Sequence, residues 1–416
     1  MPHQPAQADW IDSRYAFRRL MITLLMMTLG SSGMFVVAVV LPAVQLEFGV
    51  SRADASLPYT VMMLGLGIGG VFMGRWADRK GVHVPLLWGG LGVGSGFILA
   101  GLSSNIWWFA LCHCVLLGML GGSSAFAPLL ADTSLWWEKR RGIAVGICAS
   151  GNYVAGTVWP ALAQHGIETV GWRQTYIALG VVCGLGMMGL SFAMRQRPPL
   201  LVAPIAGSAA GPSSSSVSDR PFGLRLSYAQ ALLCVAGVAC CVAMSMPQVH
   251  IVAYCSDLGF GAARGAEMLS LMLACGIASR LLSGLICDRI GGLRTLLLGS
   301  ILQGIALFLF LFFDGLVSLY VISALFGFFQ GGIVPSYAII VREYFPPKEA
   351  GARVGSVIFA TMIGMAIGGW MSGKVFDLTG SYHAAFINGL AWNLLNLSIA
   401  TFLLWRLYKL KQATPT

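Results

Sequence analysis

Arg280 stands in an apolar part of the sequence, where a charged side chain requires an explanation. The surrounding segment, CGIASRLLSGLICD (275–288), consists of small and apolar residues apart from Arg280 and the aspartate at its end. An arginine deep in a membrane helix costs ~3 kcal/mol on insertion scales unless it faces a cavity or a partner. Its guanidinium offers paired donors that match a planar carboxylate. We therefore predict a binding site for a carboxylate substrate at Arg280, and a structural ion pair is the alternative.

Two residues near the end of an earlier apolar segment are candidates for proton coupling. His250 would titrate near neutral pH if unperturbed, and the alternative role is a hydrogen bond to the backbone. Asp257 either loads a proton from outside or is an ordinary carboxylate at a helix end. Along a straight helix Asp257 lies roughly 20 Å from Arg280, so we expect no ion pair between them unless the helix breaks at Pro247. A proton carried on the substrate would leave neither residue essential.

Other polar and aromatic side chains in the middle of apolar segments are candidates for lining the same site. A buried amide needs a hydrogen-bond partner, which a substrate or a neighbouring helix can supply. For an aromatic wall, the alternative is a position facing lipid or the core. The candidate substrate contacts are Asn152, Tyr153, Gln330, Tyr337 and Phe359.

The sequence predicts neither a metal centre nor an enzyme. Cys112, His113 and Cys114 are adjacent, but neighbours on a helix point about 100° apart and cannot ligate one ion together. The apolar segments contain no nucleophile with a nearby base, so we predict no catalytic residue. We likewise expect no cofactor, with a proton as the only coupling ion.

The elements that would hold these residues are membrane-spanning helices. The chain has 416 residues, of which 57% are hydrophobic and 10% charged, against roughly 45–50% and about 25% in soluble domains. Segments of about 20 residues, enough to cross ~30 Å of hydrocarbon, recur along the chain. The sequence predicts an all-α membrane protein with twelve spans: 20–47, 55–76, 84–102, 106–130, 142–165, 175–194, 228–254, 265–287, 295–313, 317–341, 352–376 and 384–405.

The basic residues predict the orientation of these spans, since short cytoplasmic loops retain Lys and Arg. Of the 26 basic residues, all but five fall on one side if both termini are cytoplasmic. The exceptions are Arg52, Arg173, Arg264 and Lys374 on the other side, and Arg280 within a span. The net charge of +10 is thus explained by topology, and a nucleic-acid partner is not expected.

The chain also divides into two related halves. We predict a cytoplasmic tail (1–19), a six-helix bundle (20–194), a linker rich in Pro and Ser (195–227), a second bundle (228–408) and a tail (409–416). At an offset of about 210 residues, GRWADRKG corresponds to GLICDRIG. The matched residues are Gly74, Asp78, Arg79 and Gly81 with Gly284, Asp288, Arg289 and Gly291. A duplication explains these matches, and it pairs Arg280 with Gly70, so the predicted charge belongs to one half alone.

The duplicated pattern GxxxDRxG resembles the signature loop of the major facilitator superfamily. This resemblance implies two pseudo-symmetric bundles that rock about a central site between them. Asp78 and Asp288 would then lie near the amino ends of the eleventh and fifth spans, where free amides favour a carboxylate. We expect the two loops to latch the cytoplasmic gate; the alternative is that they only set topology.

Within that superfamily the chain resembles the monocarboxylate transporters and the related oxalate/formate antiporters. The similar segments are HIVAYCSDLG, SRLLSGLICDRIG and WWEKRRGIAVGICASGNYVAG. The resemblance implies that Arg280 binds the substrate carboxylate. Mammalian members carry an aspartate one helical turn before that arginine, whereas this chain has Gly276 there. They also carry a lysine in the first span, whereas the first span of this chain is uncharged through its middle. The oxalate antiporters place a lysine inside the eleventh span, whereas Lys374 lies at its end.

These expectations combine into one functional hypothesis. We expect a proton-coupled symporter of small monocarboxylates such as L-lactate, with an organic anion antiporter of the oxalate/formate type as the alternative. The expected setting is the inner (plasma) membrane of a bacterium, where the chain would be a multi-pass protein that works as a monomer in the lipid bilayer.

Overall fold

The computed structural model describes residues 10–197, 221–346 and 349–413, which form helices and no strand. The N-terminal half contains a π-helix, η2 (Cys112–Gly122), inserted between two α-helices. Its helices are α1 (Arg14–Gly30), α2 (Ser32–Phe48), α3 (Arg52–Lys80), α4 (His83–Gly101), α5 (Ile106–Leu111), η2, α6 (Ser123–Leu135), α7 (Arg141–Val170) and α8 (Trp172–Ala193).

The C-terminal half begins with a short 3-10 turn, η3 (Pro221–Gly223). It continues with α9 (Leu226–Asp257), α10 (Ala262–Ile290), α11 (Gly292–Leu309), α12 (Leu316–Gln330), α13 (Ile333–Tyr344), α14 (Ala350–Thr379) and α15 (Tyr382–Ala413). Three spans consist of consecutive pieces, namely α1 with α2, α5 with η2 and α6, and α12 with α13. Counted this way, the described helices confirm the twelve predicted spans.

The helices extend beyond the predicted apolar segments because their ends are polar but still helical. Helix begins at Arg14 within the predicted tail 1–19, at Leu226 within the predicted linker, and continues to Ala413 within the predicted tail 409–416. Residues 198–220 of the predicted linker lie outside the described residues. Among the described residues, eleven spans are long and apolar enough to cross a membrane. The remaining span, α7, is of similar length, and Asn152 and Gln164 reduce its hydropathy.

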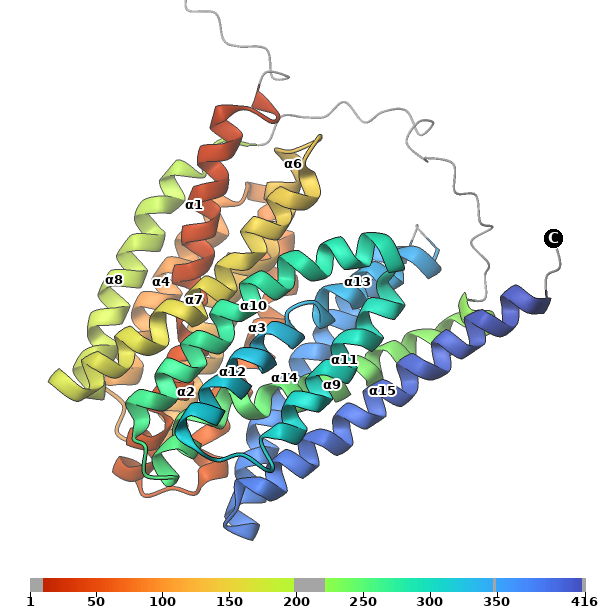
Figure 1. Cartoon of the computed structure of the whole chain (residues 1–416). Helices are drawn as coiled ribbons and strands as arrows, with labels where there is room; N and C mark the ends of the chain where they lie inside the picture. The colour runs from red at the N-terminus through yellow and green to blue at the C-terminus, as the bar shows by residue number, and fades with distance from the viewer. Residues whose placement is uncertain (1–9, 198–220, 347–348, 414–416) are drawn as a thin grey trace, which may run out of the picture.

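The two halves contact each other along paired helices. α3 packs against α14, α7 packs against α10, and α2 packs against α9. We call the end of the bundle where α1 begins and α15 ends the terminal face, and the end where α2 meets α3 the opposite face. Figure 1 shows the halves meeting at the opposite face and diverging toward the terminal face, where the start of α1 and the end of α15 lie far apart.

Glycines along the paired helices show where this contact stops. A Cβ on Gly373 would lie 3.0 Å from the Ala53 Cα, and one on Gly369 would lie 2.9 Å from the Tyr59 ring. Farther along, a Cβ on Gly67 would lie 2.7 Å from the Phe359 ring. The same close fit joins α7 and α10, where a Cβ on Gly156 would lie 3.0 Å from Leu273 Cγ. Beyond these levels, toward the terminal face, a Cβ would meet nothing within 4 Å at Gly70, Gly74, Gly142, Gly146, Gly284, Gly351 or Gly355. The protein is therefore closed at the opposite face and open at the terminal face.

The duplicated loop pattern has a local structural reason. Gly81 ends α3 with φ 86° and Gly291 ends α10 with φ 85°, a conformation that residues with a Cβ rarely adopt. In both halves the glycine N–H donates at 2.8 Å to a carbonyl four residues earlier, Ala77 or Cys287. The two loops thus share one turn, which supports the prediction of a duplication.

Close backbone packing inside the C-terminal half gives a stability prediction. A Cβ on Gly327 of α12 would lie 2.6 Å from the Met272 carbonyl carbon of α10, and this backbone cannot move aside as a side chain can. We expect Gly327→Ala to destabilise the protein by ~1–3 kcal/mol through overpacking. Gly189→Ala is the matched control, since a Cβ there meets nothing within 4 Å. Thermal unfolding in detergent measures both, and equal melting temperatures would contradict the prediction.

Candidate functional site

Arg280 lies on α10 where the paired helices begin to diverge. Its guanidinium carbon is 4.6 Å from the centre of the Tyr153 ring, and its Nη1 donates a 3.1 Å hydrogen bond to the Ala149 carbonyl. Both partners belong to α7 in the other half. Arg280 Nε is buried and has no hydrogen-bond partner among the described residues. The site is therefore shared between the halves and keeps unused donor capacity on the arginine.

No carboxylate pairs with Arg280 in the described part of the chain. The ion pairs found there join Arg19 with Asp132, Arg52 with Asp257, Arg173 with Glu47, Arg264 with Glu267 and Arg353 with Glu349. The alternative to a substrate site was a structural ion pair, which would need an acidic partner for Arg280. Arg280 is not a member of any of these pairs. The predicted lack of a pairing between Asp257 and Arg280 is confirmed.

Gly276 provides the space that Tyr153 occupies. A Cβ built on Gly276 would lie 2.6 Å from Cδ1 of the Tyr153 ring. The ring, 8% exposed, is thus packed between the α10 backbone at Gly276 and the guanidinium one turn later. An aspartate at position 276 would not fit beside this tyrosine as it lies here.

The other predicted substrate contacts occupy different environments. Gln330 accepts a 3.1 Å hydrogen bond from Gln248, and its own Nε2 is buried without a partner among the described residues. Tyr337 donates a 2.8 Å bond to Asn396 of α15 and is fully buried inside the C-terminal half. Phe359 packs near Gly67 between α14 and α3 and is 37% exposed. Asn152 is partly buried, and its side chain makes no hydrogen bond within the described ranges. Of these predicted contacts, Tyr153 lies against Arg280. Substrate contact stays a prediction for all five residues.

His250 lies inside the C-terminal half, away from solvent. Its Nε2 is 2.8 Å from the Gly369 carbonyl, which can only accept, so Nε2 carries the proton and donates. Its Nδ1 then accepts from the Tyr382 hydroxyl at 3.3 Å. The backbone hydrogen bond named as the alternative to a proton relay is therefore present, and the relay stays a prediction.

Asp257 takes part in a clamp at the opposite face. Both carboxylate oxygens accept from Arg52 Nη2 at 3.1 Å, so a residue at the end of α9 is tied to the start of α3. Asp377 of α14 accepts from the backbone N–H groups of Arg52 and Ala53 at 2.8 Å, capping α3. The Arg52 guanidinium also lies 4.8 Å from the Phe376 ring. These contacts join the halves and give Asp257 the role of a helix-end carboxylate here; proton loading by Asp257 stays a prediction.

The duplicated gate motif faces solvent at the terminal face. Asp78, Arg79, Asp288 and Arg289 are exposed, and none of their side chains makes a hydrogen bond or ion pair within the described ranges. Gly74 and Gly284 are equally without neighbours at their Cβ positions. This state fits the open terminal face, and the latch formed by these residues stays a prediction for the closed one.

Sequence reasoning missed a second buried arginine, Arg19, which it assigned to the tail. Arg19 binds Asp132 through Nε at 2.9 Å and Nη2 at 3.0 Å, and the two residues are 3% and 7% exposed. The Trp136 ring lies 4.5 Å from the guanidinium. Asp132 falls just outside the predicted fourth span, as Arg19 falls just outside the first. The sequence therefore did not indicate that the two residues form a buried pair. Neither Ala149 nor Asp377 carried a signal, because a backbone carbonyl and a helix-end carboxylate look ordinary in sequence.

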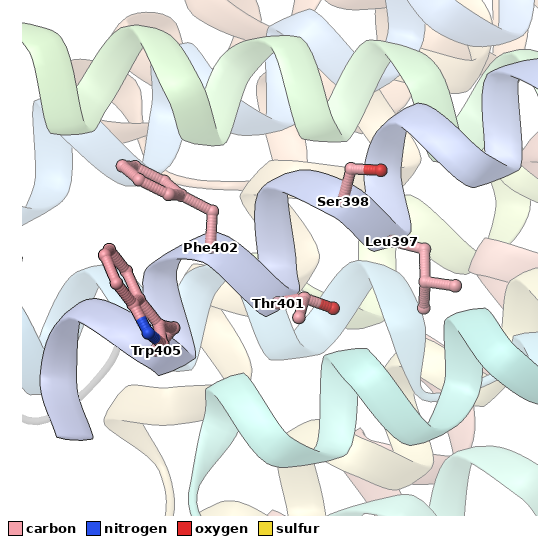
Figure 2. A pocket seen from close by; sticks show the side chains of 5 residues that line it. All are labelled: Leu397, Ser398, Thr401, Phe402 and Trp405. Atoms are coloured by element: carbon pink, nitrogen blue, oxygen red, sulfur yellow. The ribbon is translucent and has the colours of Figure 1, made fainter.

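One surface hollow lies apart from this site. It measures about 440 Å³ and is lined by Leu397, Ser398, Thr401, Phe402 and Trp405, all on α15. Figure 2 shows the Phe402 and Trp405 rings projecting from that helix. Both rings are exposed, at 38% and 48%, which suits contact with lipid. None of the candidate residues lines this hollow.

The sequence is similar to a known family and to named proteins. The model of the Major Facilitator Superfamily matches residues 21–316 and 233–415. Monocarboxylate transporter 13 of Rattus norvegicus is 28% identical over 339 residues, which cover 80% of this chain and 75% of that protein. The chain is thus similar over most of its length to a named monocarboxylate transporter.

Solved structures show the same fold. A bacterial homolog to the human lysosomal transporter Spinster, in an inward-facing and unoccupied conformation, aligns with a TM-score of 0.67 and 15% identity, covering 94% of this chain and 95% of that one. The nucleoside transporter NupG aligns with a TM-score of 0.72 and 12% identity over 94% of this chain and 100% of that one. At such low sequence identities, these two structures support the arrangement of the helices but not a shared substrate.

Proposed function

This chain belongs to the major facilitator superfamily, and we propose that it carries a small monocarboxylate across the membrane by alternating access. The observation that carries the proposal is Arg280, a guanidinium between the halves whose Nε has no partner in the described chain. Arg280 lies on α10 at the level where the close packing between the paired helices ends and the two halves begin to diverge toward the open terminal face. A carboxylate arriving from that face would meet a preorganised cation, which supports transport of an organic acid.

The charge of the site favours a monoanion. Among the described residues, Arg280 is the basic side chain that lies between the two halves at the level of Tyr153. Lys374 lies near the end of α14 at the opposite face. One guanidinium balances one carboxylate, whereas a dianion such as oxalate would keep a second charge without a partner. Similarity to monocarboxylate transporter 13 supports the same substrate class. L-lactate and pyruvate are therefore the proposed substrates, with oxalate/formate-type antiport as the second candidate.

We place the terminal face in the cytoplasm because the loops there carry most of the basic residues. The state described above would then be open to the cytoplasm and closed outside by the Arg52 clamp. Arg280 and Tyr153 belong to the same chain, and we propose that the protein transports as a monomer. The proposed membrane is the inner membrane of a bacterium.

A competition panel in proteoliposomes tests the substrate class. Uptake of labelled L-lactate should be inhibited by lactate and pyruvate strongly, by acetate and formate less, and by oxalate least. Inhibition by oxalate at the lowest concentration, together with a strict need for a counter-substrate inside the vesicles, would replace symport by the antiport alternative.

Proton coupling gives a separate prediction. An anion entering against a negative interior pays ~2.3 kcal/mol per 100 mV, and one accompanying proton cancels this cost. We expect lactate uptake to acidify the vesicle lumen, to accelerate when the outside is made more acidic than the inside, and to ignore a potassium diffusion potential. A pH-sensitive dye trapped in the lumen measures the first effect. Uptake that leaves the lumen pH unchanged and follows the membrane potential would refute cotransport.

A further inference from the structure

We propose that Tyr153 positions the Arg280 guanidinium so that one edge, formed by Nε and Nη2, holds the substrate carboxylate. This inference rests on the proposed function, because it concerns how the same site binds its anion. It assigns the tyrosine a role through its ring face, whereas the sequence had indicated a direct contact with substrate. The inference is argued from Arg173 and Arg19, which bind carboxylates through Nε and Nη2; Arg52 differs, since it holds its carboxylate through Nη2 alone.

Arg173 shows the complete arrangement at the opposite face. Its guanidinium carbon lies 4.5 Å from the Trp172 ring, and its Nη1 donates to the carbonyls of Gly101 and Ser103 at 2.8 and 2.6 Å. Its Nε and Nη2 donate to Glu47 at 3.0 and 2.6 Å. The three parts are an aromatic ring on the face, backbone oxygen on Nη1, and a carboxylate on the Nε and Nη2 edge.

Arg19 repeats two of the three parts in a buried setting. The Trp136 ring lies 4.5 Å from the guanidinium, and Nε and Nη2 donate to the two oxygens of Asp132 at 2.9 and 3.0 Å. Paired donors of this kind are the geometry in which arginine binds a planar carboxylate best. Both arginines therefore use the same edge for the anion while an aromatic ring supports the face.

Arg280 has the first two parts from the protein. The Tyr153 ring supports the face at 4.6 Å, and the Ala149 carbonyl accepts from Nη1 at 3.1 Å. Nε is buried without a partner among the described residues, and Nη2 donates no hydrogen bond there either. The edge that carries Glu47 and Asp132 at the other two arginines is thus the edge that α7 leaves free. We assign the substrate carboxylate to it.

Tyr153 fulfils this role with its ring rather than its hydroxyl. The hydroxyl makes no hydrogen bond within the described ranges, while the ring lies between Gly276 and the guanidinium. A cation over an aromatic face is attracted to it, most strongly away from water. Because the ring belongs to α7 and the arginine to α10, the guanidinium is oriented only while these helices pack as they do here. Gly276 belongs to the same unit, since any side chain there would displace the ring.

The test compares variants of residue 153 in proteoliposomes by the KM and maximal rate of lactate uptake. Tyr153→Leu should raise KM about tenfold and change the maximal rate little. The conservative Tyr153→Phe, which keeps the ring, should recover most of the affinity. Gly276→Ala should raise KM in the same direction, and little further when combined with Tyr153→Leu. Tyr228→Leu is the matched control, because Tyr228 is 55% exposed on α9, and its KM should equal that of the parent.

Two results would overturn the inference. A parental KM in both Tyr153→Leu and Gly276→Ala would show that the ring does not orient the arginine, and equal loss in Tyr153→Phe and Tyr153→Leu would show that the hydroxyl matters instead. Arg280→Ala in the same series separates this inference from the proposed function. If Arg280→Ala transports normally, the proposed function fails; if it is inactive while the Tyr153 variants keep the parental KM, only the positioning role fails.

Discussion

Arg280→Ala is expected to lower the kcat/KM of lactate uptake by about a hundredfold or more. The substitution removes two charge-assisted hydrogen bonds, each worth ~1.5–3 kcal/mol, and 1.4 kcal/mol corresponds to a factor of ten. Arg280→Lys should recover little of this loss, since an ammonium lacks the planar pair of donors and has no face to stack on the Tyr153 ring. Concentration-dependent uptake in proteoliposomes measures both variants.

The stability of the same variants shows whether the arginine serves binding or folding. Arg280 pairs with no acid in the described chain, so Arg280→Ala leaves no carboxylate without its cation and should melt near the parental temperature. Arg19→Ala is the contrasting control, because it would leave the buried Asp132 alone, a change that costs ~3–5 kcal/mol. Saturable lactate uptake by a folded Arg280→Ala protein would refute the site, and a collapse of stability equal to that of Arg19→Ala would favour a structural role.

The features that could be predicted from the sequence are those with a local cause. Apolar length determines which segments can cross a bilayer, so each of the twelve spans appeared near its predicted position. The duplicated loops were visible because a turn with positive φ requires glycine at Gly81 and at Gly291. Arg280 was visible because a charge among apolar residues stands out in any window. Each of these signals is contained within a few residues of chain.

The features that could not be predicted depend on how separate helices lie against each other. Tyr153 meets Arg280 only because α7 and α10 pack at a level where Gly276 leaves space for the ring, and spacing along either helix does not reveal that level. The clamp between Arg52 and Asp257 also needs the relative placement of the two halves. The sequence likewise does not show that the terminal face is open. The structure shows it, because a Cβ would meet nothing within 4 Å at the glycines of the paired helices near that face.

Gly284→Leu is expected to slow transport by about 10- to 100-fold while leaving substrate binding intact. Gly284 lies on α10, where a Cβ meets nothing within 4 Å in the present state. At the closed face, glycines of the same paired helices are in close contact with the other half, as at Gly156 and Gly373. Because the halves are related by duplication, we expect Gly284 to be packed this closely once the terminal face closes. A leucine there would overpack that state by ~1–3 kcal/mol and hold the protein open.

The control and the readout separate a blocked gate from a damaged fold. Gly189→Leu also introduces a side chain where a Cβ meets nothing within 4 Å, but on α8, outside the paired helices, and should transport normally. Gly74→Leu changes the duplicate position on α3 and should behave like Gly284→Leu. Lactate-induced thermal stabilisation reports binding, and initial uptake rates report turnover. Leucine has a higher helix propensity than glycine, so Gly284→Leu and Gly74→Leu should both remain folded. Parental uptake rates in both variants would show that the terminal face closes without contact at these glycines.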